Sequence, residues 1–377
     1  MEQQYLIRLS ENRSLNTIYK MNITSLPSPP SGGILEHIQS FLTSKDIPSY
    51  RFRQLVHALQ QGSINFEDVK ELPKPLREQL VSRFGITPLP LTIVESHSSK
   101  QVEKILFETR SKAKIETVLS HYRSGWTSMC ISSQCGCGLG CSFCATAAMG
   151  LMKNLTADEI CAQVFHPHWQ RKLPDSIAFM GMGEALANPN IFTAIKAFTT
   201  KGYGGFSQTR ITMSTVGFAP HLERLVREFP NVTITLSVHS PFPEQRAELI
   251  PLETKFPLAD NLAVLDQYVS TYNRKVYLAY LLIKDLNDTE EHLDALVAMV
   301  KAQYRPELYH ISVIRYNQAF GANAAYQQPT AEKVSMFVAQ LQSRGIHATK
   351  RTQFGSGIEA ACGQLHATYE QKKNRSK

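Results

Sequence analysis

After residue 125 the chain alternates between short apolar runs and amphipathic segments of helical length, and this alternation restricts the fold more than any other feature. The apolar runs read as strands and cover residues 126–131, 176–181, 209–215, 232–239, 275–283 and 308–315. Helical patterns open at the capping-box sequence Thr156-Ala157-Asp158-Glu159 and cover 190–199, 220–229, 259–270, 289–303 and 330–344. Repeated strand–helix units predict a parallel sheet with helices outside it. We therefore predict an α/β fold, built as a partial (βα)6-type barrel.

The chain before residue 126 is organised differently. Residues 1–33 form an N-terminal extension that ends in a linker rich in Pro, Ser and Gly. Short helical patterns predict a small N-terminal helical accessory domain over 34–90. Residues 91–125 read as an extended connecting segment, with candidate strands at 102–108 and 115–119. The barrel domain is then expected over 126–370, followed by a basic tail at 371–377.

The 377 residues are enough for one large domain and a small one. The formal net charge of +8 would attract a polyanionic partner, although charge alone does not identify one. The basic tail reads equally as a solvated end or as an RNA contact. No apolar stretch reaches the ~18 residues of a membrane span, and the N-terminus lacks a signal pattern. These features predict a cytoplasmic protein with no membrane partner.

Five of the seven cysteines lie between residues 130 and 144. Such clustering indicates metal or redox chemistry rather than a disulfide framework. Cys137, Cys141 and Cys144 follow the first barrel strand with the spacing Cys-x3-Cys-x2-Cys. Three thiolates can hold three irons of a [4Fe–4S] cluster and leave the fourth iron open to a small ligand. The alternative is zinc, which usually takes four ligands, and no second cysteine pair or histidine lies nearby.

This cysteine spacing, with Phe143 between the last two cysteines, resembles the signature of the radical S-adenosylmethionine (SAM) superfamily. The resemblance implies that the open iron binds the amino and carboxylate groups of SAM. It also implies that SAM is cleaved reductively to a 5′-deoxyadenosyl radical, so that the cofactor supplies the difficult chemistry.

Longer segments resemble the RlmN/Cfr family of methyltransferases, which act on an adenosine of 23S ribosomal RNA. The matching segments are 130–137, Met180-Gly181-Met182-Gly183-Glu184, 213–217, Ser237-Val238-His239 and Ala360-Ala361-Cys362-Gly363-Gln364-Leu365. Together with the helical domain, the resemblance covers about residues 34 to 370. It implies 23S rRNA as the partner, an electron donor such as flavodoxin or ferredoxin, and a monomeric enzyme.

Within this family the chain looks like the Cfr type, which methylates C8 of a single adenosine in the peptidyl transferase centre and confers antibiotic resistance. The residues that carry this choice are Cys135, Ala185-Leu186-Ala187-Asn188, 314–317 and 351–355. Two departures from the Cfr pattern are residues 145–150 and Gln318, which replaces a proline. The alternatives are RlmN-type C2 methylation of the same adenosine and a radical SAM enzyme that acts on a small molecule.

The family mechanism, carried over to this sequence, uses two SAM molecules per turnover. The first methylates Cys362, and the radical made from the second abstracts hydrogen from that methyl group, which then adds to the adenine ring. Glu116 matches the proposed proton acceptor. Cys130 matches the thiol that attacks the sulfur of Cys362, forming a disulfide and releasing the RNA. Each also has a structural interpretation: core packing for either cysteine, and an exposed strand carboxylate for Glu116.

The remaining candidate residues lie at predicted strand ends, where such folds carry their chemistry. Gly183 would admit the ligand, and the Glu184 carboxylate would accept a hydrogen bond from the SAM amino group. Further SAM contacts are expected from Ser214, Ser237, Val238, His239 and Asn317, each of which also suits a plain strand-end cap. In the helical domain the candidates for RNA phosphate contacts, or for a merely solvated basic face, are Arg51, Arg53, Lys70, Lys74, Arg77 and Arg83.

Overall fold

The computed structural model describes residues 34–60, 63, 65–169, 173–200, 204–318 and 321–351. The predicted extension 1–33, the segment that contains Cys362 and the basic tail 371–377 lie outside the described residues. The chain forms two compact units. The smaller unit contains the chain up to Pro90 together with 156–173 and 192–207, and the larger contains 91–155, 174–191 and the chain from Gln208 onward.

The smaller unit is helical. Its elements are α3 (Ile34–Ser44), α4 (Tyr50–Gln60), η1 (Phe66–Asp68), α5 (Lys74–Phe84), α7 (Ala157–Phe165) and η2 (Pro167–Trp169). Apolar side chains at helical spacing, such as Ile38, Leu42 and Leu55, are buried together in its core. The capping box predicted at Thr156 is present, since the Glu159 amide donates to Thr156 Oγ1 at 3.1 Å and the Thr156 amide donates to Glu159 Oε2 at 3.0 Å.

The larger unit is built on a mixed sheet, whose described strands run in the order β1-β2-β3-β4-β7-β8-β9-β10-β11-β12. The strands are β1 (Leu91–Ser98), β2 (Val102–Thr109), β3 (Lys114–His121), β4 (Thr127–Ile131), β7 (Ser176–Phe179), β8 (Ile211–Thr215), β9 (Thr233–Ser237), β10 (Val276–Leu282), β11 (Tyr309–Arg315) and β12 (His347–Lys350). Strands β1 to β4 pair antiparallel, whereas β4 and β7 to β12 pair parallel. Within the described residues β1 and β12 are the edge strands, so the sheet is open.

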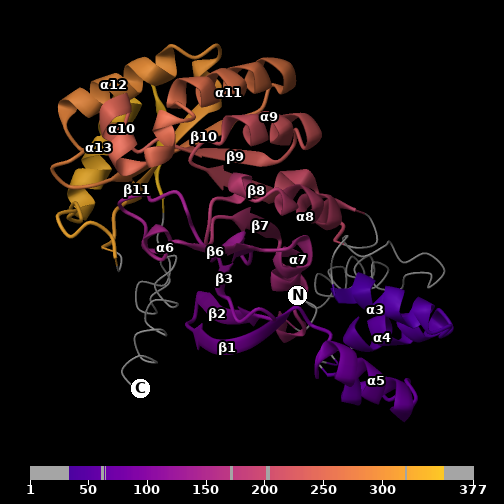
Figure 1. Ribbon diagram of the computed structural model, residues 1–377. Helices are drawn as coiled ribbons and strands as arrows, with labels where there is room; N and C mark the ends of the chain where they lie inside the picture. Colours follow the sequence, from indigo (N-terminus) through magenta and orange to yellow (C-terminus); the bar gives the residue numbers. More distant parts are fainter. Residues whose placement is uncertain are drawn as a thin grey trace, which may run out of the picture. The chain divides into compact units, whose positions relative to one another are not determined.

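Helices follow the parallel strands and line their outer side (Figure 1). In the larger unit they are α9 (Ala219–Glu228), α10 (Pro243–Leu249), α11 (Leu258–Tyr272), α12 (Glu290–Lys301) and α13 (Ala331–Ser343). The helix that follows β7, α8 (Asn190–Thr199), belongs mostly to the smaller unit. Short 3-10 turns lie at η3 (Ala185–Ala187), η4 (Gln208–Arg210), η5 (Pro251–Thr254) and η6 (Pro306–Leu308). In α13 the buried residues Val334, Phe337 and Leu341 recur every three or four positions, so one face packs on the sheet.

The predicted fold class is confirmed: an α/β sheet of successive parallel strands with a set of N-terminal helices. All six predicted barrel strands are present, but β1, β12 and α10 were not predicted as elements. β12 has four residues, of which three are exposed, and α10 has seven residues, so neither offers a periodic pattern long enough to recognise. None of the described helices is long and apolar enough to cross a membrane.

Candidate functional site

The cysteine loop leaves the carboxyl end of β4. It carries a small hairpin, β5 (Gln134–Gly136) paired with β6 (Leu151–Asn154), and the short helix α6 (Ala145–Ala148). Gly136 closes this loop tightly at a φ of 72°, and a Cβ atom there would lie 1.8 Å from the carbonyl oxygen of Gly150. The loop therefore needs glycine at this position, next to the first of the three signature cysteines.

The three signature cysteines lie in apolar surroundings. Cys137 and Cys141 are buried and Cys144 is half-buried. Cys141 packs in a cluster with Leu249, Ile250 and other apolar side chains from α10, η5 and β10. Three thiol groups thus share one protected loop at the carboxyl edge of the sheet.

The protein environment alone disfavours thiolates in this loop. Burial raises the pKa of Cys137 to about 11, and the neighbouring Cys144 contributes to the rise. Burial also raises the pKa of Cys141 strongly, with Cys144 and Cys137 as the next causes. The three sulfurs are therefore close enough to interact electrostatically. Thiolates at such a site need a compensating positive charge, which the irons of a cluster supply.

Among the described residues, no three His, Cys, Asp or Glu side chains are gathered as the ligands of one metal ion would be. In a four-iron cluster each thiolate binds a different iron, so the ligands lie farther apart than around a single ion. The loop therefore fits a [4Fe–4S] cluster, because it offers three protected thiols that are not gathered around a single ion.

Gly183 and Glu184 follow β7 at the same edge of the sheet. Gly183 has a φ of 94°, and a Cβ atom there would lie 2.4 Å from Gln134 Cβ. The Glu184 carboxylate is 5% exposed and accepts hydrogen bonds from the Leu186 amide and the Val216 amide, both at 2.9 Å. Burial raises the pKa of Glu184, and these bonds oppose the rise. The Thr215 hydroxyl also bonds to this carboxylate. A carboxylate has about four lone-pair sites, so one remains for a hydrogen bond from a ligand.

The other predicted SAM contacts lie at the ends of neighbouring parallel strands. Ser214 lies in β8, Ser237 ends β9 with Val238 directly after it, and Asn317 follows β11. Ser237 and Val238 are buried, whereas Ser214 and Asn317 are half-buried. Asn317 accepts a hydrogen bond from the side chain of Gln328. Parallel strands bring their carboxyl ends to one edge, so these residues share the edge that carries the cysteine loop.

His239 contacts the cysteine loop directly. Its ring meets the Phe143 ring edge to face, with centroids 4.9 Å apart. Its backbone is left-handed, with φ at 61°, which is uncommon for a side chain of this size. Its Nδ1 accepts a hydrogen bond from the Leu281 amide at 3.1 Å. Burial, with the Arg246 charge as the second cause, lowers the pKa of His239 to about 3, so the ring is neutral at pH 7.

Glu116 and Cys130 lie on the antiparallel side of the sheet. Lys104 pairs opposite Val118, which pairs opposite Cys130, so these three side chains share one face. Glu116 is two residues before Val118 and shares that face too. Lys104 Nζ lies 2.9 Å from Glu116 Oε2, and both side chains are buried. The structure thus brings Glu116 and Cys130 together, beside a lysine that the sequence did not single out.

The Cys130 thiol is half-buried and free. Burial raises its pKa to about 11, and the Arg351 guanidinium partly opposes this rise. No disulfide joins any of the cysteines within the described part of the chain. The predicted Cys130–Cys362 disulfide is therefore not supported, and Cys362 itself lies outside the described residues.

The two remaining described cysteines, Cys135 and Cys161, are buried. Cys135 is fully buried and its thiol donates to the Lys114 carbonyl at 3.1 Å. Cys161 is 1% exposed within α7, and burial raises its pKa well above the ordinary value.

In the smaller unit the basic residues divide into two groups. Arg51 and Arg77 are half-buried and donate to backbone carbonyls of their own unit, those of Glu71 and Glu67. Arg53 is half-buried too, whereas the exposed members are Lys70, Lys74 and Arg83. Among the exposed three, Lys70 Nζ also donates to the Glu67 carbonyl at 3.0 Å, and Lys74 Nζ lies 3.9 Å from Glu78 Oε1.

Two buried charged residues near the candidate site, Lys104 and Arg246, were not predicted from the sequence. Lys104 sits in an ordinary strand pattern, and Arg246 lies on the unpredicted helix α10, yet both are almost fully buried and ion-paired. A charged residue inside an apolar strand run was the only available signal for Lys104. Nothing local marks Arg246, because its partners lie 7 to 9 residues away or, for Val216, 30 residues away, all of them outside α10.

Comparison with known proteins defines the class to which this fold and loop belong. Residues 131–297 match the radical SAM superfamily, and this segment contains the three signature cysteines. A solved structure, that of a radical SAM methyltransferase from Sphaerobacter thermophilus, superposes with a TM-score of 0.77 at 34% identity, covering 88% of this chain and 96% of that one. The chain is thus a radical SAM protein, a family that implies a [4Fe–4S] cluster and SAM.

Two relatives narrow the assignment. The chain is 44% identical over 335 residues to the ribosomal RNA large subunit methyltransferase Cfr of Staphylococcus warneri, covering 88% of this chain and 96% of that protein. It is 43% identical over 339 residues to the protein of the same name from Shouchella clausii, covering 90% and 97%. This chain belongs to the Cfr family.

Proposed function

We propose that this chain methylates C8 of a single adenosine in the peptidyl transferase centre of 23S rRNA, and thereby confers resistance to ribosome-targeting antibiotics. The observation that carries the proposal is the 44% identity to Cfr across 88% of the chain. It is supported by Ala185-Leu186-Ala187-Asn188 after Glu184, where the sequence follows the Cfr type. Adenine C8 carries no nucleophile, so radical chemistry suits this substrate.

We propose that Cys137, Cys141 and Cys144 hold the cluster and that SAM binds at the adjoining strand ends. When bound, this cofactor pair supplies the reductive cleavage that makes a carbon radical. Glu184 orients the ligand through its remaining carboxylate lone pair, while Leu186, Val216 and Thr215 fix the carboxylate. Gly183 lets the Gln134 side chain approach the backbone before Glu184 closely, and the neutral His239 ring braces the cysteine loop through Phe143.

The methyl group is proposed to travel on Cys362, so that two SAM molecules are used per turnover. Glu116 accepts the proton that the adenine carbon loses, and the ion pair with Lys104 holds its carboxylate in place. Cys130 then attacks the sulfur of Cys362, so that the carbon–sulfur bond to the RNA breaks and a transient sulfur–sulfur bond forms. A thiol reductant must then return both cysteines to the free form, the state in which Cys130 is found here. Glu116 and Cys130 share one sheet face, which supports consecutive roles for them at one position.

The RNA is proposed to be held in part by the smaller unit. Exposed Lys70, Lys74 and Arg83 suit phosphate contacts, which lack sequence specificity. A stacked adenine must leave its helix to reach Cys362, so the target base is flipped out or presented in partly unfolded RNA. A small iron–sulfur or flavin protein is the proposed electron donor, and the chain is proposed to act as a monomer.

The test is methyl transfer from labelled SAM to 23S rRNA by the anaerobically reconstituted chain, with Cys362→Ala as the matched variant. We expect label in RNA with the wild type, and no label but continued SAM cleavage with Cys362→Ala. Methyl transfer to RNA by Cys362→Ala would contradict the proposed carrier. Cleavage of SAM without any transfer to RNA by the wild type would favour a small-molecule substrate.

A further inference from the structure

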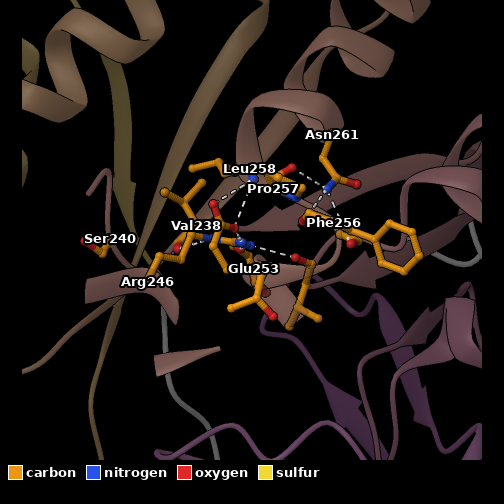
Figure 2. A network of polar contacts seen from close by, with 12 residues as sticks. Val238, Ser240, Arg246, Glu253, Phe256, Pro257, Leu258 and Asn261 are labelled. Carbon is orange, nitrogen blue, oxygen red and sulfur yellow. Dashed lines mark hydrogen bonds and ion pairs between the residues drawn. The ribbon is translucent and has the colours of Figure 1, made fainter. Parts of the chain in front are cut away.

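A buried arginine on α10 contacts the strand ends that we assign to SAM. Arg246 is 1% exposed. Its Nε donates to the Val238 carbonyl at 3.0 Å, and its Nη2 donates to the Ser237 carbonyl at 2.9 Å. Nη2 also donates to the Val216 carbonyl at 2.6 Å. One side chain therefore ties the end of β9 to the segment that follows β8 (Figure 2).

The charge of Arg246 is balanced within the same network. Its Nη1 forms an ion pair with Glu253 Oε2, and Glu253 is 5% exposed. The Leu258 amide donates to both Glu253 oxygens, at 3.1 and 2.9 Å (Figure 2). Burying a charge costs several kcal/mol unless it is paired and hydrogen-bonded, and here both partners are. The network is thus a rigid connection between backbone segments.

The same short helix reaches the cysteine loop. The Ser142 amide, next to Cys141, donates to the Leu249 carbonyl at the end of α10 at 3.1 Å. The Cys141 side chain packs against Leu249 and Ile250. Arg246 lies one turn before Leu249, so α10 links the strand ends on one side to the cysteine loop on the other.

We propose that Arg246 is a positioning residue: through α10 it holds the SAM-binding strand ends in place relative to the loop that holds the cluster. This inference rests on the proposed function, which assigns Ser237 and Val238 to SAM. A ligand that is bound at one end by an iron and at the other by strand ends requires a fixed spacing between them. The planar guanidinium supplies this by reaching three carbonyls and a carboxylate, whereas a lysine ammonium is a single point charge.

The test compares Arg246→Lys with Arg224→Lys in the reconstituted full chain. Arg224 forms an exposed ion pair with Glu228, with 2.7 Å between Nε and Oε1, so it controls for loss of a guanidinium in general. Iron content is measured first. SAM affinity is then obtained by titrating SAM against the electron paramagnetic resonance spectrum of the reduced cluster. We expect about four irons per chain in both variants, and a SAM Kd raised about tenfold or more only in Arg246→Lys.

An unchanged SAM Kd in Arg246→Lys at full iron content would overturn the inference. If Arg246→Lys fails to take up iron, Glu253→Gln replaces it, since this change keeps an acceptor for the Leu258 amide and removes the opposing charge. A raised Kd in Glu253→Gln supports the inference and an unchanged one overturns it. Wild-type chain that takes up iron but does not bind SAM would contradict the proposed function instead, because RNA methylation is not part of this measurement.

Discussion

Two buried ion pairs among the described residues of the larger unit stabilise different kinds of structure. Lys104 Nζ and Glu116 Oε2 lie 2.9 Å apart and connect two antiparallel strands. Arg246 instead contacts Glu253 and three backbone carbonyls from two strand ends. A lysine acts as a point charge and an arginine as a planar fork. The first pair therefore fixes a side chain, and the second fixes backbone.

The two ion pairs lie in different parts of the sheet, and these parts have different proposed roles. The antiparallel strands carry Glu116 and Cys130, which we propose act on the adduct with RNA. The ends of parallel strands β8 and β9 carry the residues proposed to bind SAM, and they must stay in place relative to the cysteine loop. Damage to the first pair should therefore affect steps on RNA, and damage to the second should affect SAM binding.

The largest expected effect is that of Glu116→Gln, which keeps the shape of the side chain and removes the proton acceptor. RNA methylation should slow by about 10²- to 10⁴-fold, the usual contribution of a general base. SAM affinity should stay unchanged, because Glu116 lies on the antiparallel part of the sheet. The initial rate of label transfer to RNA measures methylation, and a SAM titration of the same variant measures its SAM affinity.

The control for this prediction is Glu228→Gln, which removes an exposed carboxylate from an i,i+4 ion pair on α9. Its methylation rate should match that of the wild type. If Glu116→Gln methylates RNA at the wild-type rate, Glu116 is not the proton acceptor, and its ion pair with Lys104 has only a structural role.

The second prediction compares the stabilities of the two pairs. Lys104→Met should lower the free energy of unfolding by about 3–5 kcal/mol, because it removes the buried cation that faces the buried Glu116 carboxylate. Arg246→Met should cost at least as much, since three carbonyls also lose their donor. Adding Glu116→Gln to Lys104→Met should restore most of the loss. Urea unfolding followed by circular dichroism measures all three, and a loss below about 1 kcal/mol for either single variant, the usual value of a surface pair, would contradict the comparison.

The third prediction concerns the reactivity of Cys130. With its pKa raised to about 11, the thiol is almost wholly protonated at pH 8. Iodoacetamide should alkylate it about a hundredfold more slowly than an ordinary cysteine, because the thiolate is the nucleophile. The rate should rise about tenfold per pH unit from 8 to 10. Peptide mass spectrometry follows the reaction, and a rate that levels off near pH 9 would mean an ordinary pKa.

The smallest expected effect is the pH dependence that His239 gives to stability. Its folded pKa of about 3 lies below its unfolded value, so the folded chain binds fewer protons. The contribution of His239 to the free energy of unfolding is therefore present above about pH 6.5 and is lost as the pH falls toward 3. At pH 5.5 this loss is about 1.4 kcal/mol. The difference in unfolding free energy between wild type and His239→Gln should shrink between pH 7.5 and 5.5. A constant difference would show that His239 titrates normally.

The regular part of the fold could be predicted because its signals are local. Strands β7 to β11 are short apolar runs, and the helices between them carry one buried stripe, so each pattern reports its own burial. The edge strand β12 and the seven-residue helix α10 depend on what they pack against. Their sequences alone do not distinguish them from loops.

The candidate site divides in the same way. The cysteine loop and Glu184 lie in contiguous motifs and could be located from the sequence. The partnership of Lys104 with Glu116 depends on strand register, and that of Arg246 with Val216 and Val238 depends on tertiary packing. Such contacts between distant segments require coordinates.

The central claim is methylation at adenine C8, and the methyl position on the product RNA tests it most directly. 23S rRNA treated with the reconstituted chain and SAM would be digested to nucleosides and compared by mass spectrometry with 8-methyladenosine and 2-methyladenosine standards. We predict 8-methyladenosine, and its absence after reaction with Cys362→Ala. A product that is only 2-methyladenosine would contradict the account.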